Sequence, residues 1–140
     1  MSEYELHVSS DTDPSPKCSQ LCASLAEKLW VAPELLRMPE RPARGTKEGD
    51  VFSFAIIVQE ILLRTVPYPA TTRSTTEILE FVKQQRATPF RPTFDADTPD
   101  TEPGMFRLMT SCWDEDPDER PIFRDVIKTI VKINGGRSET

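Results

Sequence analysis

The most apolar stretch of the chain lies near its middle and has the spacing of an α-helix. Ten of the thirteen residues from Val51 to Leu63 are apolar, and six of the apolar residues fall at i, i+3, i+4, i+7, i+10 and i+11 counted from Val51. Most of the remaining helix surface is also apolar, which is typical of a helix that others cover on every side. We therefore predict a central, buried helix that begins near Thr46 and ends at about Leu63.

Shorter helices are predicted on both sides of this central one. Ser74 and Glu77 have the spacing of a capping box, in which each side chain bonds the other residue's backbone N–H. Pro121 favours the first turn of a last helix, and Gly135 favours its stop. No strand pattern is found, so the fold is predicted to be mainly α, with further helices at about residues 34–37, 77–85, 103–113 and 121–134.

The chain of 140 residues has the length of one domain and divides into three regions. Residues 1–28 are rich in Ser, Thr, Asp and Pro and are predicted to be mobile. Residues 29–134 hold all the predicted helices, and residues 135–140 form a short polar tail.

Charge and composition disfavour several classes of function. The formal net charge of −6 argues against nucleic acid or an anionic membrane surface as a partner. The apolar run at 51–63 is short for a bilayer span and contains Gln59 and Glu60, so direct membrane insertion is not expected. Three cysteines make an odd, sparse set, which indicates a reducing intracellular environment. The acidic N-terminus does not have the pattern of a signal peptide.

Candidate catalytic and metal-binding motifs are weak. Asp114, Asp116 and Asp118 have the 1-3-5 spacing of a calcium loop, but Glu119 stands where that loop needs glycine, so a solvated acidic turn is favoured. The chain carries no Gly-rich phosphate loop. The candidates for a zinc site, His7, Cys18, Cys22 and Cys112, are scattered along the chain, so a zinc site is not favoured. We therefore predict no catalytic, cofactor-binding or metal-binding residue in this chain.

Two charged residues stand where local rules disfavour them. Arg120 immediately precedes the predicted last helix, where a small polar cap is preferred and a cation opposes the helix dipole. A residue that breaks a local rule usually binds a residue elsewhere in the fold, so Arg120 is expected to have such a partner. The alternative is that Arg120 is exposed to solvent. Asp50 immediately precedes the apolar run. If its carboxylate is buried, the desolvation cost must be offset by hydrogen-bond donors. At the start of a helix, the helix dipole also favours an acidic side chain.

Several short motifs together resemble the second half of a protein kinase domain. They are Ala32-Pro33-Glu34, the Asp-x-aromatic-Ser element DVFSF at 50–54, and CWDEDPDERPIF at 112–123. Within that family the stretches KLWVAPELLR, GDVFSFAIIVQEILLR, PYP and FRPTF are most similar to the kinase homology domain of receptor-type guanylate cyclases.

The resemblance implies a fold and roles for particular residues. The chain would be the C-terminal part of the helical large lobe, with residues 1–28 corresponding to the activation segment. Glu34 is expected to pair with Arg120, with Trp113 packed beneath the pair. Asp50 is expected to accept hydrogen bonds from backbone N–H groups of a catalytic loop preceding residue 1. Glu3-Tyr4-Glu5 would stand at an altered magnesium-binding motif.

The resemblance also implies a function. The chain would be a regulatory, pseudokinase-like segment of a receptor guanylate cyclase, on the cytoplasmic side of the plasma membrane and not catalytic by itself. Its partners would be the rest of the kinase homology domain and the cyclase domain, within a homodimeric parent. Regulatory ATP, and GTP with a divalent metal, are implied for the parent only. The alternatives are a fragment of an active tyrosine-kinase-like phosphotransferase and a free-standing helical interaction module.

Overall fold

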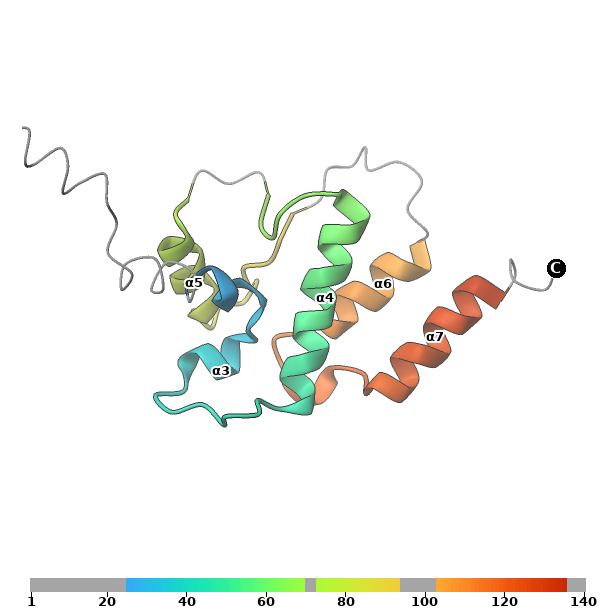
Figure 1. The fold of residues 1–140 in the computed structure, drawn as a ribbon, viewed down its shortest axis with the longest axis horizontal. Coiled ribbons are helices and arrows are strands. Elements are labelled where there is room, and N and C mark those ends of the chain that lie inside the picture. Colours follow the sequence, from blue (N-terminus) through green and yellow to red (C-terminus); the bar gives the residue numbers. More distant parts are fainter. Residues whose placement is uncertain (1–24, 70–72, 94–102, 136–140) are drawn as a thin grey trace, which may run out of the picture.

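The computed structural model describes residues 25–69, 73–93 and 103–135, and these residues form helices joined by loops (Figure 1). The described residues contain no strand, which confirms the prediction of a mainly α fold. The region predicted to be mobile, 1–28, lies outside the description except for its last four residues, which are helical. In chain order the elements are η1 (Lys28–Trp30), α3 (Pro33–Arg37), α4 (Lys47–Leu63), α5 (Thr75–Lys83), α6 (Pro103–Cys112), η2 (Pro117–Glu119) and α7 (Phe123–Gly135).

The central helix is α4, with α3 and α5 on one side of it and α6 and α7 on the other (Figure 1). Thr46 caps its start, because its side-chain oxygen accepts a hydrogen bond from the Gly49 N–H at 2.9 Å. Gly49 also lets α3 approach closely: a Cβ atom there would lie 2.7 Å from Leu35 Cδ1. Arg64 ends the helix in the left-handed region, with φ 51°.

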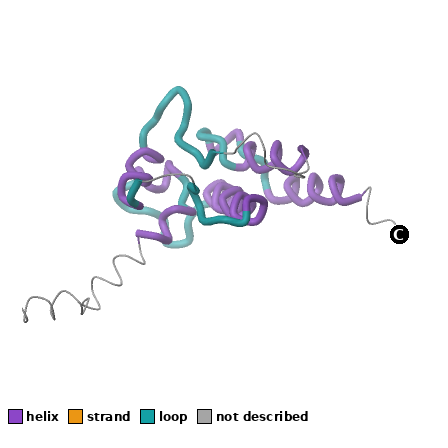
Figure 2. The backbone as a smooth tube through the Cα atoms, turned by 90° about the horizontal axis from the view of Figure 1, so that it is seen from above, coloured by secondary structure: helices purple, strands orange, loops and turns teal. Residues whose placement is uncertain are grey.

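The core is one cluster around α4, to which α3, α5, α6 and α7 all contribute buried side chains. Phe52, Ala55 and Ile56 of α4 are fully buried and belong to one cluster with Met109 and Cys112 of α6. Figure 2 looks nearly along α4 and shows α6 and α7 beside it on one side. Burial of these apolar side chains supplies most of the driving force for packing the helices.

The described residues cover α4 only in part, although its apolar pattern is that of a helix with neighbours on every side. Ile57 is 45% exposed and Ile61 is 67% exposed, and they lie one turn apart on the same face of α4. The last helix has a similar outer stripe, in which Phe123, Ile127 and Val131 are 39%, 60% and 62% exposed. The helical pattern therefore identifies apolar faces correctly, but it does not say which faces this chain covers by itself.

The last helix was predicted to start near Pro121, and it begins two residues later, at Phe123. The N–H of Arg120 bonds to the Pro117 carbonyl and closes the η2 turn, and Pro121 favours extended backbone at Arg120, which has φ −73° and ψ 141°. The Ile122 carbonyl accepts the first backbone bonds of α7. Arg120 therefore ends a turn, and it is not the cap of α7 as the sequence suggested.

The exposed apolar faces lead to an expectation about solubility. We expect the double variant Ile61→Lys and Ile127→Lys to stay monomeric at higher protein concentration than the original chain, because large exposed apolar patches promote association. Light scattering across a concentration series measures this effect. Urea unfolding should shift by no more than about 0.5 kcal/mol, since both side chains are on the surface. Lys128→Gln, on the same helix as Ile127, serves as the matched control. Equal aggregation of the original chain, the double variant and this control would contradict the expectation.

Candidate functional site

The most highly connected polar group in the described part of the chain is the guanidinium of Arg120. Its Nη1 lies 2.7 Å from Glu34 Oε1 and its Nη2 donates to Glu34 Oε2 at 2.8 Å, so the ion pair is bidentate. The Arg120 side chain is fully buried and the Glu34 side chain is 17% exposed. The contact that the kinase resemblance implies is thus present in the structure.

Arg120 also bonds to backbone on two further elements. Nη1 donates to the Glu48 carbonyl in the first turn of α4, and Nε donates to the Asp114 carbonyl just after α6, both at 2.9 Å. We call Arg120, Glu34 and these two carbonyls the arginine junction. It joins the start of α3, the start of α4 and the loop after α6, which are far apart in the sequence.

An aromatic ring lies against the junction from the side of the core. The ring centroid of Phe52, which is fully buried, is 5.2 Å from the Arg120 guanidinium carbon and 5.0 Å from that of Arg91. Such distances allow cation–π attraction. Trp113 is also buried in the core cluster, one residue before Asp114, and its packing beneath the ion pair remains a prediction.

A second cluster of charged side chains was not predicted from the sequence. Arg91 donates from Nε to the Trp113 carbonyl at 3.0 Å and from Nη2 to Glu115 Oε1 at 3.1 Å. The other oxygen of Glu115 pairs with Arg37 of α3 at 3.0 Å. Burial lowers the pKa of Arg91, and the nearby Glu115 carboxylate acts in the opposite direction. No sequence signal marks this cluster: Arg91 precedes a proline, but so does the exposed Arg41.

The segment before Ala32-Pro33-Glu34 is held by two side chains of α4. Ser53 Oγ donates to the Trp30 carbonyl at 2.7 Å, and Trp30 Nε1 donates to Glu60 Oε2 at 2.9 Å. Ser53 and Glu60 are seven residues apart and therefore lie on one face of the helix. Both stand in the motifs that carry the kinase resemblance, although the sequence did not show what they contact.

Asp50 is exposed in the first turn of α4, and its carboxylate makes no hydrogen bond or ion pair with the described residues. Its backbone N–H bonds to the Thr46 carbonyl as part of the helix. The expected acceptance of hydrogen bonds from a catalytic loop concerns residues outside this chain and stays a prediction. The Asp50 carboxylate lies at the helix N-terminus, where the helix dipole favours a negative charge. Because the side chain is exposed, it does not carry the desolvation cost of a buried carboxylate.

The metal candidates do not come together in the part of the chain that is described, where no group of three or more potential ligands forms. The Asp114 and Asp116 carboxylates accept backbone N–H bonds from Asp116 and Asp118, both at 2.9 Å, as expected for an acidic turn. Cys112 is buried, and burial raises the pKa of its thiol to about 11. The other zinc candidates fall among the residues that are not described: His7, Cys18 and Cys22.

The chemistry of the arginine junction is that of a clamp. The Glu34 carboxylate and the two carbonyls all accept hydrogen bonds from the one guanidinium. A buried, bidentate pair with two extra acceptors holds its partners in one geometry, and removal of either charge would leave the other buried without a counter-charge. The arrangement therefore fixes the start of α3, the start of α4 and the loop after α6 relative to one another.

A sequence profile for protein tyrosine and serine/threonine kinases matches residues 9–130. This chain belongs to the protein kinase family. The arginine junction lies entirely within the matched residues. Among the helices of the described kinase-like segment, none is long and apolar enough to span a membrane.

The curated relatives of this kinase-family chain include receptor guanylate cyclases. The chain is 42% identical to atrial natriuretic peptide receptor 2 of Anguilla japonica over 114 residues, which is 80% of the chain and 11% of the receptor. It is 35% identical to guanylate cyclase 32E of Drosophila melanogaster over 139 residues, 97% of the chain and 12% of the cyclase. It is 40% identical to retinal guanylyl cyclase 1 of Mus musculus over 114 residues, which is 81% of the chain and 10% of that cyclase. The chain thus spans about a tenth of these relatives, and the predicted resemblance is confirmed.

Proposed function

We propose that this chain is a regulatory, pseudokinase-like segment of a receptor guanylate cyclase, in which it relays the receptor signal to cGMP synthesis. The observation that carries the proposal is the similarity to receptor guanylate cyclases, at 35–42% identity over 75–97% of the chain. The arginine junction supports it, because a clamp between distant segments suits the transmission of a conformational change.

The proposal extends to the parent protein. Its partners would be the remainder of the kinase homology domain and the cyclase domain, within a homodimer on the cytoplasmic side of the plasma membrane. Regulatory ATP would bind in the parent outside these 140 residues, and GTP with a divalent metal would be used by the cyclase domain. Residues of this chain would act by position and not by contact with either nucleotide.

One expected result separates this proposal from an active kinase. We expect the purified chain of 140 residues to show neither ATP hydrolysis nor phosphate transfer. The reason is that its sequence contains no Gly-rich phosphate loop and no motif that would supply a metal ligand or a catalytic base. The measurement is release of phosphate and incorporation of radiolabelled phosphate, with Glu34→Gln as the matched control. Activity that persists through repeated purification and is lost in that variant would contradict the proposal and favour a phosphotransferase.

The regulatory role itself is tested in the full-length parent. Deletion of the segment corresponding to residues 29–134 should abolish the increase in cGMP caused by the receptor ligand, while the cyclase domain still converts GTP without ligand. Loss of both activities would indicate a fold defect, and a second variant, Glu34→Gln in the intact parent, should reduce the ligand response alone. An unchanged ligand response in both proteins would overturn the proposal and favour a free-standing interaction module.

A further inference from the structure

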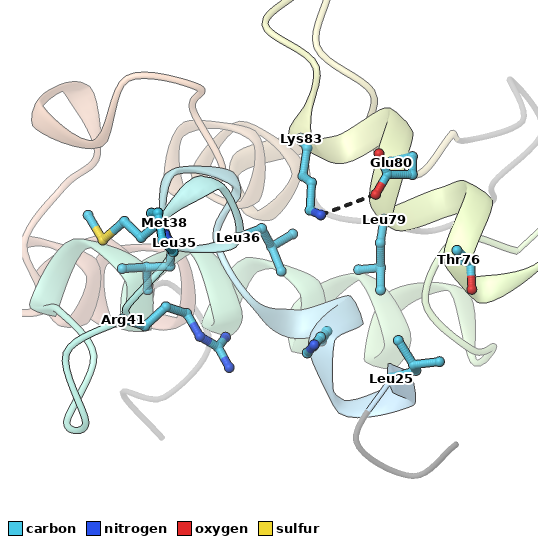
Figure 3. A pocket seen from close by; sticks show the side chains of 11 residues that line it. Leu25, Leu35, Leu36, Met38, Arg41, Thr76, Leu79, Glu80 and Lys83 are labelled. Atoms are coloured by element: carbon cyan, nitrogen blue, oxygen red, sulfur yellow. Dashed lines mark hydrogen bonds and ion pairs between the residues drawn. The ribbon is translucent and has the colours of Figure 1, made fainter. Parts of the chain in front are cut away.

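A surface pocket of about 320 Å³ lies between α3, α5 and the η1 turn, away from the arginine junction. We call it the α3–α5 pocket. Figure 3 shows Leu35, Leu36 and Met38 on one side of it, Thr76, Leu79 and Glu80 on the other, and Lys83 reaching between them. The remaining lining residues are Leu25, Lys28, Pro39 and Arg41.

The floor of the α3–α5 pocket is aliphatic. Leu35 and Leu79 are buried at its base, and Leu36 is half-buried beside them. Met38 stands at the rim with 41% of its surface exposed. Burial of another aliphatic or aromatic side chain against these residues would be favourable by the ordinary hydrophobic effect.

The rim of the pocket is cationic, although the whole chain carries a formal charge of −6. Lys83 is paired at 3.1 Å with Glu80, the only acidic side chain among the described residues that line the pocket. Lys28 and Arg41 line the pocket without any ion partner among the described residues. In Figure 3 the Arg41 side chain extends from the loop after α3 toward the pocket. Two cations that have no ion partner in the described part of the chain therefore lie beside an aliphatic floor, and the surface is both apolar and positively charged.

We propose that the α3–α5 pocket binds an acidic peptide segment that inserts one aliphatic or aromatic side chain. Its flanking carboxylates would pair with Lys28 and Arg41, and its apolar side chain would contact Leu36 and Met38. A volume of 320 Å³ is at the low end of the range for small-molecule sites, about 300–1,000 Å³, and suits a side chain better than a whole nucleotide. This binding site does not depend on the proposed function.

Charge complementarity selects the occupant. A partner that carries its own cations would face Lys28 and Arg41 with like charge, whereas carboxylates gain charge-assisted hydrogen bonds there. An anionic membrane is disfavoured because the aliphatic floor lies in a pocket, which an inserted side chain can reach and a flat surface of lipid headgroups cannot. A protein segment with alternating acidic and apolar side chains meets both the floor and the rim.

The test uses the full chain and an array of nine-residue peptides. Each peptide has a central Leu, Ile, Phe or Trp flanked by Glu and Asp, and a matched peptide carries Gln and Asn instead. We expect the acidic peptides to bind better than their neutral partners, with affinity that falls as salt is added. Arg41→Glu should weaken the best peptide about tenfold, since it removes one surface contact and adds a repulsion. Met38→Asp should weaken it as well.

Arg44→Glu is the matched control, because Arg44 is exposed in the same loop but does not line the pocket. We expect it to change affinity by less than about twofold. Equal binding of acidic and neutral peptides, equal effects of Arg41→Glu and Arg44→Glu, or no binding across the array would each overturn the proposal. Self-association of the chain that Arg41→Glu abolishes would assign the pocket to a second copy and would also overturn it.

Discussion

Replacement of Arg120 by alanine is expected to lower the free energy of unfolding by about 3–5 kcal/mol. The variant leaves the Glu34 carboxylate close to the core without its counter-charge, and it removes the donors to the Glu48 and Asp114 carbonyls. Because a typical domain has about 5–15 kcal/mol of stability in total, the loss should leave much of the protein unfolded near body temperature.

Urea unfolding followed by circular dichroism measures the Arg120 effect. The matched control is Lys83→Ala, which breaks the exposed pair between Lys83 and Glu80 and should cost only about 0–1 kcal/mol. If the two variants lose similar stability, the arginine junction is not the anchor that its burial indicates.

Further variants separate the charge of the ion pair from its geometry. Glu34→Gln keeps the guanidinium and its two backbone acceptors, so we expect it to cost less than Arg120→Ala. The exchange Glu34→Arg with Arg120→Glu restores opposite charges but places a carboxylate against two carbonyl oxygens. It should therefore fail to restore stability. Full rescue by the exchange would show that net charge alone matters.

Helices with a strong local signal were predictable from the sequence. The helix α4 was predicted from near Thr46 to about Leu63, and its observed bounds are Lys47–Leu63, because the apolar period and the capping threonine are both local. The capping box of α5 is present, with both hydrogen bonds between Ser74 and Glu77. Such features depend on residues three or four positions apart, so the order of the chain reveals them.

Features that depend on how distant loops meet were not predictable from pattern alone. The shift of the α7 start from Pro121 to Phe123 follows from the η2 turn, which competes for the same residues. The Glu115 contacts with Arg37 and Arg91 join residues 78 and 24 positions apart. No periodicity encodes such a contact. The Glu34–Arg120 pair, 86 positions apart, was expected only through the family resemblance.

Replacement of Phe52 by alanine should be the second severe substitution, with an expected loss of about 3–5 kcal/mol. The side chain is fully buried, so truncation leaves a cavity in the centre of the core, and two guanidinium groups lose the ring that faces them. Phe54→Ala is the matched control on the same helix. It should cost less, because Phe54 is only partly buried and its ring contacts Phe123 at the edge of the core.

Phe52→Leu tests whether the ring acts through its π face as well as its volume. Leucine fills most of the space, so packing alone should cost less than about 1.5 kcal/mol, and any cation–π attraction adds to the loss. Because Arg120 faces the ring at 5.2 Å, the effects of Phe52→Leu and Arg120→Ala should not add. The double variant should lose less than the sum of the single variants, by about 0.5–2 kcal/mol, since the second change removes a contact already lost. Strict additivity in that cycle would mean that Phe52 supports the arginine junction through packing only.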